Sequence, residues 1–189
     1  MRQPKGEYGY IKSQQKVYLI GAIIGFIVMA ILYCMNTFIY TEGNVLLLIT
    51  VLLALPEAQF VVKLILYTRY KEGNENSYRK LEAVTDKLVY LASLGIVRGK
   101  KTLFYESIVV SDNELVLLIS NDTTRKELME YKELVDKLVR PKGYLVDIKI
   151  FNNDEDIYNY VKNQLKGKLN NIDTTKQVNL ANLLLDNAI

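Results

Sequence analysis

Two long apolar runs, separated by only four residues, constrain the fold of this 189-residue chain more than any other feature. Residues 17–40 and 45–67 each exceed the roughly 20 helical residues that cross a bilayer core about 30 Å thick. The first run is longer than the apolar core of a cleavable signal peptide, and no small-residue cleavage pattern follows Tyr40. The sequence therefore predicts a hairpin of two transmembrane helices, joined by an external loop at residues 41–44.

Basic residues on both flanks of this hairpin determine its expected orientation. The loop contains no base, whereas four basic residues precede the first run and four follow the second: Arg2, Lys5, Lys12, Lys16, Arg69, Lys71, Arg79 and Lys80. Positively charged flanks stay in the cytoplasm. We therefore expect a protein of the cell membrane with both termini in the cytoplasm and a basic N-terminus over residues 1–16.

Residues 78–189, which follow a polar linker at 68–77, have the composition of a water-soluble domain. Residues 73–189 contain seventeen basic and seventeen acidic side chains. This neutral balance argues against a nucleic-acid partner, because nucleic-acid binding usually needs a basic face. The chain has no histidine, and its single cysteine, Cys34, lies inside the first apolar run. Because the commonest general base and the commonest zinc ligands are missing, we expect no catalytic site, no metal site and no cofactor.

The predicted elements of this domain begin with a helix and a β-hairpin. Apolar residues recur every three or four positions between Leu81 and Leu91, which predicts a helix that Ser77 caps and that runs to about Leu94. Strand-like stretches at 102–111 and 114–120 follow. Asp112 and Asn113 between them suit a two-residue turn, because both residues tolerate a positive φ.

Helices and strands alternate in the rest of the domain. A capping box of Thr124 and Glu127 begins one helix, and residues 144–151 resemble a strand. Asn153 caps the next helix, and a last helix covers residues 176–189. Because a strand–helix–strand step forms a parallel crossover, we expect a small cytoplasmic α/β domain with a mixed sheet flanked by helices.

The second apolar run contains four residues that a simple anchor does not need: Pro56, Glu57, Gln59 and Lys63. Pro56 has no N–H, so the Leu52 carbonyl loses its helical partner. Glu57 lies near the expected bilayer centre, where a charge costs roughly 2.5–3.5 kcal/mol. Lys63 is about 120° away from Glu57 around the helix and close enough to the cytoplasmic end to reach water.

Three interpretations of Glu57 follow. A protonated carboxyl donates to a main-chain carbonyl such as that of Leu52; the carboxyl meets Glu57, Gln59 or Lys63 of another copy; or it faces water in a pore made by several copies. We expect the Pro-Glu pair to mark an interface, most simply between the chains of a homo-oligomer.

Two further patterns each have a functional and a structural interpretation. Gly21 and Gly25 are four positions apart, a spacing that lets two helices approach closely, either within this hairpin or between copies. Asp147 and Lys149 lie on one face of a predicted strand. An acid-x-Lys pair occurs in restriction-endonuclease-like enzymes, but there it normally lies on the second strand of the hairpin. A surface ion pair is the structural alternative.

The segment "ALPEAQ" at residues 54–59, the two adjacent spans and the small cytoplasmic domain resemble uncharacterised membrane proteins of low-GC Gram-positive bacteria. The resemblance implies the topology described above and no particular activity.

The function that we expect is a non-enzymatic, membrane-anchored binding or scaffold module. Its lipid-embedded hairpin oligomerises, and its cytoplasmic domain binds an unknown protein or small ligand. A second hypothesis is a ligand-gated effector or channel built from oligomerised hairpins. A third is an enzyme on a nuclease-like fold.

Overall fold

The computed structural model describes residues 4–38, 45–70, 72–84, 88–99, 101–120, 123–165 and 172–189. The chain divides into two compact units. One consists of a pair of long helices, Ile11–Lys71, and the other combines Gln3–Tyr10 with Glu72–Ile189. The second unit is therefore discontinuous in sequence, with the helical pair inserted between its two segments.

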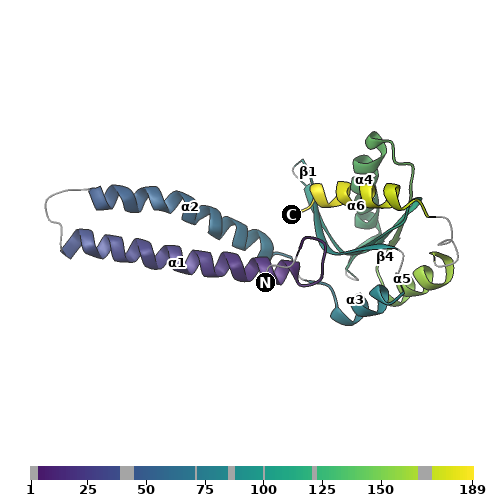
Figure 1. Cartoon of the computed structure of the whole chain (residues 1–189), viewed down its shortest axis with the longest axis horizontal. Coiled ribbons are helices and arrows are strands. Elements are labelled where there is room, and N and C mark those ends of the chain that lie inside the picture. Colours follow the sequence, from purple (N-terminus) through teal and green to yellow (C-terminus); the bar gives the residue numbers. More distant parts are fainter. Residues whose placement is uncertain are drawn as a thin grey trace. The chain divides into compact units, whose positions relative to one another are not determined.

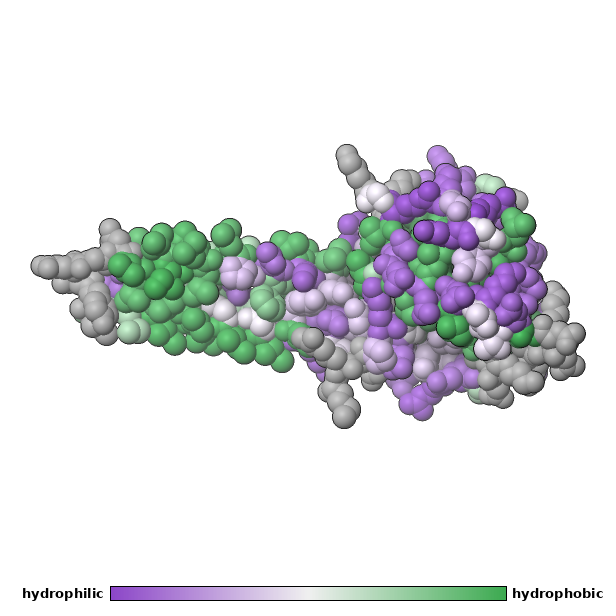
Figure 2. Space-filling model, turned by 45° about the horizontal axis from the view of Figure 1, so that its top comes forward, coloured by the Kyte–Doolittle hydropathy of each residue, from purple (hydrophilic) through white to green (hydrophobic). Residues whose placement is uncertain are grey.

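The helical pair consists of α1 (Tyr10–Phe38) and α2 (Val45–Thr68). Both are long and apolar enough to cross a membrane, judged by length and composition. Figure 2 shows hydrophobic residues over most of the displayed surface of this pair, whereas hydrophilic residues predominate on the other unit. The two predicted apolar helices are thus confirmed, and α2 continues through Pro56 without a break. The predicted loop at 41–44 lies outside the described residues.

A four-stranded mixed sheet forms the centre of the second unit. Its strands are β1 (Val89–Arg98), β2 (Lys101–Val110), β3 (Glu114–Leu118) and β4 (Asp147–Phe151), side by side in that order. The pairs β1–β2 and β2–β3 are antiparallel, and β3–β4 is parallel, as the predicted crossover requires. The turn between β2 and β3 contains Asp112 and Asn113 as predicted, although neither residue has a positive φ.

Helices cover both faces of the sheet, so its apolar residues are buried in two clusters (Figure 1). The helices α4 (Arg125–Val139) and α6 (Thr174–Asp186) contact one face, where Ile108 and Leu115 lie. The helices α3 (Glu75–Glu82) and α5 (Asp154–Tyr160), with the π-helical turn η2 (Val161–Leu165), contact the other face, where Val109 and Val116 lie. Consecutive strand residues point to opposite faces, which explains why all of β3 is buried. A short 3₁₀ turn, η1 (Arg140–Lys142), follows α4.

One predicted element is wrong. The segment expected to be one helix from Ser77 to Leu94 instead contains most of the short helix α3 and, from Val89 onward, the first six residues of β1. Leu91 and Leu94 are buried as predicted, but they pair with Ile108 and Tyr105 of β2. Pairing with β2 at every residue of β1 except Ser93 therefore overrides the local helical spacing.

The outer edge of β1 is covered by the two ends of the chain. Residues 4–9, here called the N-terminal strap, cover the first half of this edge. The Ala92 N–H donates to the Gly6 carbonyl at 2.6 Å. The Lys5 ammonium donates to the carbonyls of Leu185, at 3.0 Å, and Ala188. The strap therefore also binds the end of α6.

Residues 187–189, here called the C-terminal tail, cover the rest of this edge. The Val97 N–H donates to the Asn187 carbonyl at 2.8 Å, and the Ile189 N–H donates to the Gly95 carbonyl at 2.9 Å. An antiparallel bridge joins Ile96 to Ala188 between these two bonds. Strap and tail together satisfy backbone groups that an edge strand otherwise exposes.

Candidate functional site

The carboxyl of Glu57 is enclosed within the helical pair of a single chain. Its residue is only 7% exposed, although no charged partner faces it from α1. A Cβ atom built on Gly25 would lie 1.7 Å from Glu57 Oε2, so this oxygen occupies the space that any other residue at position 25 would fill. The Oε1 atom is buried without a hydrogen-bond partner among the described residues.

The glycine pair of α1 is used inside the helical pair. A Cβ on Gly21 would lie 2.7 Å from the Phe60 ring, one helical turn away from the Gly25–Glu57 contact. Both glycines therefore face α2 of the same chain and allow it to approach closely. This geometry agrees with the first of the two interpretations of this motif.

The other three residues of α2 that the sequence singled out, Pro56, Gln59 and Lys63, are exposed, whereas Glu57 is buried. The Lys63 ammonium lies 5.5 Å from the centroid of the Tyr18 ring, which in turn stacks on Tyr67 at 5.5 Å. Lys63 is thus placed for a cation–π contact. On α1, Cys34 is exposed on the apolar surface.

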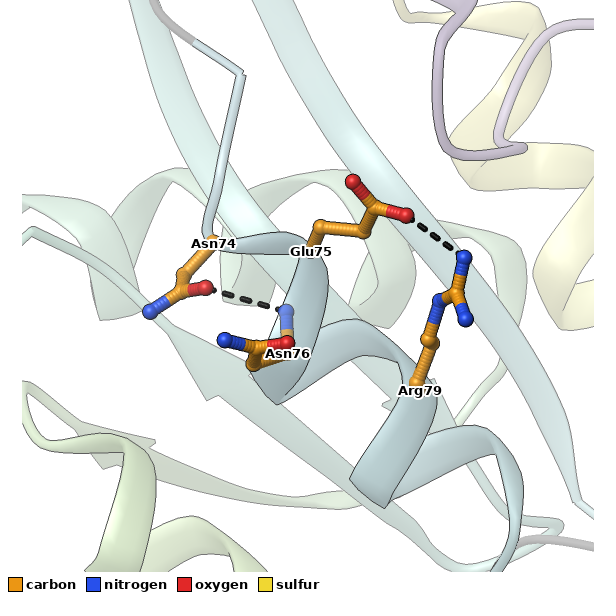
Figure 3. Close-up of polar contacts among 4 residues, drawn as sticks. All are labelled: Asn74, Glu75, Asn76 and Arg79. Carbon is orange, nitrogen blue, oxygen red and sulfur yellow. Dashed lines mark hydrogen bonds and ion pairs between the residues drawn. The ribbon is translucent and has the colours of Figure 1, made fainter.

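A second candidate site lies in the second unit, Gln3–Tyr10 with Glu72–Ile189, which is here called the sheet unit. It is a cleft of about 820 Å³ between the beginnings of α3 and α5. Asn74 caps α3 by accepting the Asn76 N–H at 3.0 Å, and an ion pair of 2.7 Å joins Glu75 to Arg79 along the helix (Figure 3). The predicted cap, Ser77, has a different role. Its hydroxyl donates to the Asp154 carboxylate and so connects α3 to α5.

The cleft is lined mainly by groups that form hydrogen bonds. Carboxamides are the commonest, together with a hydroxyl, a phenol and three charged side chains: Asn74, Asn76, Asn153, Asn159, Ser77, Tyr158, Lys80, Asp154 and Glu155. Asn153 also caps α5 as predicted, accepting the Glu155 N–H at 3.1 Å. Such a surface suits an uncharged or weakly charged ligand that carries hydroxyl or amide groups.

A half-buried carboxyl, Glu106, lines a smaller pocket that shares Asn74 and Ser77 with this cleft. Burial raises the pKa of Glu106, and the charge of Asp154 raises it further. Tyr78 and Tyr90 contact each other edge to face at 5.2 Å nearby, and Tyr8 of the strap lies 5.1 Å from Tyr78. A row of three aromatic rings therefore leads from the strap to β1, and all three rings line the smaller pocket beside Glu106.

The acid-x-Lys pair forms an ion pair on the outermost strand of the sheet. Lys149 Nζ lies 2.8 Å from the Asp147 carboxylate, and the two side chains are 43% and 54% exposed. This contact lowers the pKa of Asp147 and raises that of Lys149. The register places Asp147 opposite Glu114, whose buried carboxylate accepts the Tyr160 hydroxyl at 2.5 Å. Within the described residues, no group of three or more His, Cys, Asp or Glu side chains could hold a metal ion.

The sequence analysis predicted neither the cleft between α3 and α5 nor the contact between Glu57 and Gly25. In "GNENS", Asn74, Asn76 and Ser77 are all possible caps, and the spacing alone does not choose among them. The proximity of Gly25 and Glu57 depends on the rotation of α1 against α2, which neither apolar run encodes by itself. The two glycines were the only available signal.

The comparisons with known proteins add no relative from which a role could be transferred. No protein-family model, no curated protein and no solved structure matches this chain.

Proposed function

We propose that this chain is a two-span membrane protein whose cytoplasmic α/β domain binds a small polar ligand in the cleft between α3 and α5. The domain acts as a binding module rather than an enzyme. The hairpin holds it at the membrane surface and provides the surface on which copies assemble.

The observation that carries this proposal is the discontinuous sheet unit. Residues before α1 and residues after α2 belong to one folded unit, and the Gly9 N–H donates to the Glu72 carboxylate where the two segments meet. Two helices that leave such a unit and return to it must cross a bilayer an even number of times. This supports a hairpin with both flanks on one side, and the basic residues there favour the cytoplasm.

The position of Glu57 bears on the channel hypothesis. A carboxyl that lines a pore must contact water, whereas this carboxyl faces Gly25 of its own chain and is nearly inaccessible. The geometry of one copy therefore supports a closed hairpin as an anchor.

Topology is tested by cysteine labelling in a Cys34→Ala background. Gly43→Cys in the loop should react with a membrane-impermeant maleimide in intact cells. Asn152→Cys, at an exposed position of the sheet unit, should react only after permeabilisation. Labelling of Asn152→Cys from outside would overturn the orientation.

Ligand binding is tested with the full chain in detergent and a panel of uncharged polyols, sugars and nucleosides, followed by saturation-transfer NMR. Asn76→Trp should fill the cleft and abolish the transfer. The matched control Lys142→Trp, on η1, should retain it. Transfer that survives Asn76→Trp would place the ligand elsewhere.

A further inference from the structure

The helical pair contains one carboxyl in an environment that provides no charge to balance it. Glu57 is the only acidic residue of α2, and α1 has none. From α1 the carboxyl meets Gly25, and residues 19–32 of this helix include no ionisable side chain. On α2, the only base is Lys63, whose ammonium lies over the Tyr18 ring.

The contact with Gly25 is too close for any side chain. Because a Cβ at this position would lie 1.7 Å from Oε2 and 2.6 Å from the carboxyl carbon, the glycine Cα–H faces the carboxyl directly. A Cα–H group is a weak hydrogen-bond donor and does not balance a full negative charge. Oε1, the other oxygen, is buried and has no partner within the described residues.

We propose that Gly25 and Glu57 form a proton-binding site, in which Glu57 is held between α1 and α2 as a neutral carboxylic acid. This inference rests on the proposed membrane insertion, because in water a carboxylate at the same place could be hydrated. In a bilayer, a charge at mid-span costs roughly 2.5–3.5 kcal/mol, and the bound proton removes that cost.

Pro56 has no N–H, so the Leu52 carbonyl lacks its helical donor at this level of α2. The nearest hydroxyl in sequence, that of Thr50, already donates to the Leu46 carbonyl at 2.8 Å. A protonated Glu57 carboxyl supplies a further O–H to this part of α2. Loss of the proton leaves an uncompensated charge between the two helices. The packing of α1 on α2 is therefore linked to proton binding at Glu57.

The test is infrared spectroscopy of the full chain in vesicles of ether-linked phospholipids, which have no ester carbonyl to mask the C=O stretch of a protonated carboxyl. At neutral pH, the difference spectrum between wild type and Glu57→Gln should contain one such band. Glu57→Gln keeps the shape of the side chain, so this comparison does not depend on a disruptive variant. The absence of the band would show an ionised carboxylate and overturn the proposal.

Two glycine variants test the structure of the site. Gly25→Ala puts a methyl group onto Oε2, so the band should shift or disappear. Gly21→Ala is the matched control: its methyl group meets the Phe60 ring on the same helical face and should leave the band unchanged. An unchanged band in Gly25→Ala would overturn the role of the glycine.

Carbonate extraction of the same vesicles separates this inference from the proposed function. A chain that remains in the vesicles but shows no carboxylic acid band loses the proton site alone. A chain that is released refutes the membrane insertion and, with it, the proton site.

Discussion

Ser93 is the only non-glycine residue with a positive φ, 52°, in the part of the chain that the structure describes. An L-residue adopts this left-handed conformation at an energetic cost. It lies in the middle of β1, between the pairs Ala92–Ser107 and Leu94–Tyr105. Its hydroxyl is buried and without a hydrogen-bond partner among the described residues. The strain occurs next to Ala92, whose N–H binds the strap.

Replacing Ser93 with glycine should stabilise the protein. A left-handed conformation costs an L-residue roughly 1–2 kcal/mol, and glycine avoids most of that cost. We expect Ser93→Gly to raise the free energy of unfolding by about 1 kcal/mol after the entropic cost of glycine. Denaturant unfolding measures the change. Ser93→Ala, which removes the hydroxyl and keeps the strained backbone, should gain less; an equal gain would assign the effect to the hydroxyl instead.

The pKa of Glu106 makes a pH-dependent prediction. Burial raises this pKa above the ordinary value of 4.5, so the folded state holds the proton more tightly than the unfolded state does. The contribution of Glu106 to the free energy of unfolding therefore decreases as pH rises above 4.5, because the folded state must then bury the charged carboxylate.

Glu106→Gln should remove this penalty. The variant should melt at a higher temperature than wild type at pH 7, and the two melting curves should converge as pH falls below 4.5. Thermal unfolding across this range provides the measurement. A constant difference at all pH values would mean that packing, and not the charge, is responsible.

At the scale of elements, the edge of β1 depends on the C-terminal tail. The tail forms two backbone hydrogen bonds with β1, and a Cβ on Gly95 would lie 2.8 Å from Ile189 Cγ1. Gly95 therefore provides the space in which the last residue packs. An edge strand without such cover pairs readily with another chain.

Deletion of residues 187–189 should destabilise the sheet unit by about 2 kcal/mol, at about 1 kcal/mol for each lost hydrogen bond. It should also promote self-association through β1. Gly95→Val, which displaces Ile189 without shortening the chain, should have the same effects. Denaturant unfolding and size-exclusion chromatography measure them. A shortened chain that remains as stable as the full one would show that the tail does not protect the edge.

At the scale of the whole molecule, the sheet unit is made of two chain segments, one before α1 and one after α2 in the sequence. The strap contributes the Lys5 ammonium, the Gly6 carbonyl and the Tyr8 ring to a unit that otherwise begins at Glu72. Gly6 has a φ of 89°, and a Cβ there would lie 2.9 Å from the Leu185 side chain, so the strap requires glycine at this position.

Residues 3–10 joined to residues 72–189 by a short Gly/Ser linker should therefore fold as a soluble domain. The domain should be about 2 kcal/mol more stable than residues 73–189 alone, because it regains the hydrogen bonds of the strap. Lys5→Met in the joined chain should lose part of this gain. Equal stability of the two chains in denaturant would mean that the strap contributes nothing to the fold.

Features that depend on local spacing could be predicted from the sequence. The two apolar helices, the β2–β3 hairpin, the parallel crossover through α4 and the Asn153 cap all follow from apolar periodicity or from residues a few positions apart. Helix caps, tight turns and apolar periodicity depend on residues that are close in sequence, so a single sequence is sufficient to predict them.

Contacts between distant residues were decided only by the tertiary structure. Val89–Leu94 has the apolar spacing of a helix and becomes a strand because it pairs with β2 at all of its residues except Ser93. Gly25 meets Glu57 across 32 positions, and Lys5 meets Leu185 across 180. Such pairs leave no periodic signal in the sequence, because their energies depend on how the folded helices and strands are oriented and packed against one another. The sequence by itself determined the two long apolar helices and the helices α4, α5 and α6 of the sheet unit, and the tertiary structure decided where the Glu57 carboxyl and the two ends of the chain are placed.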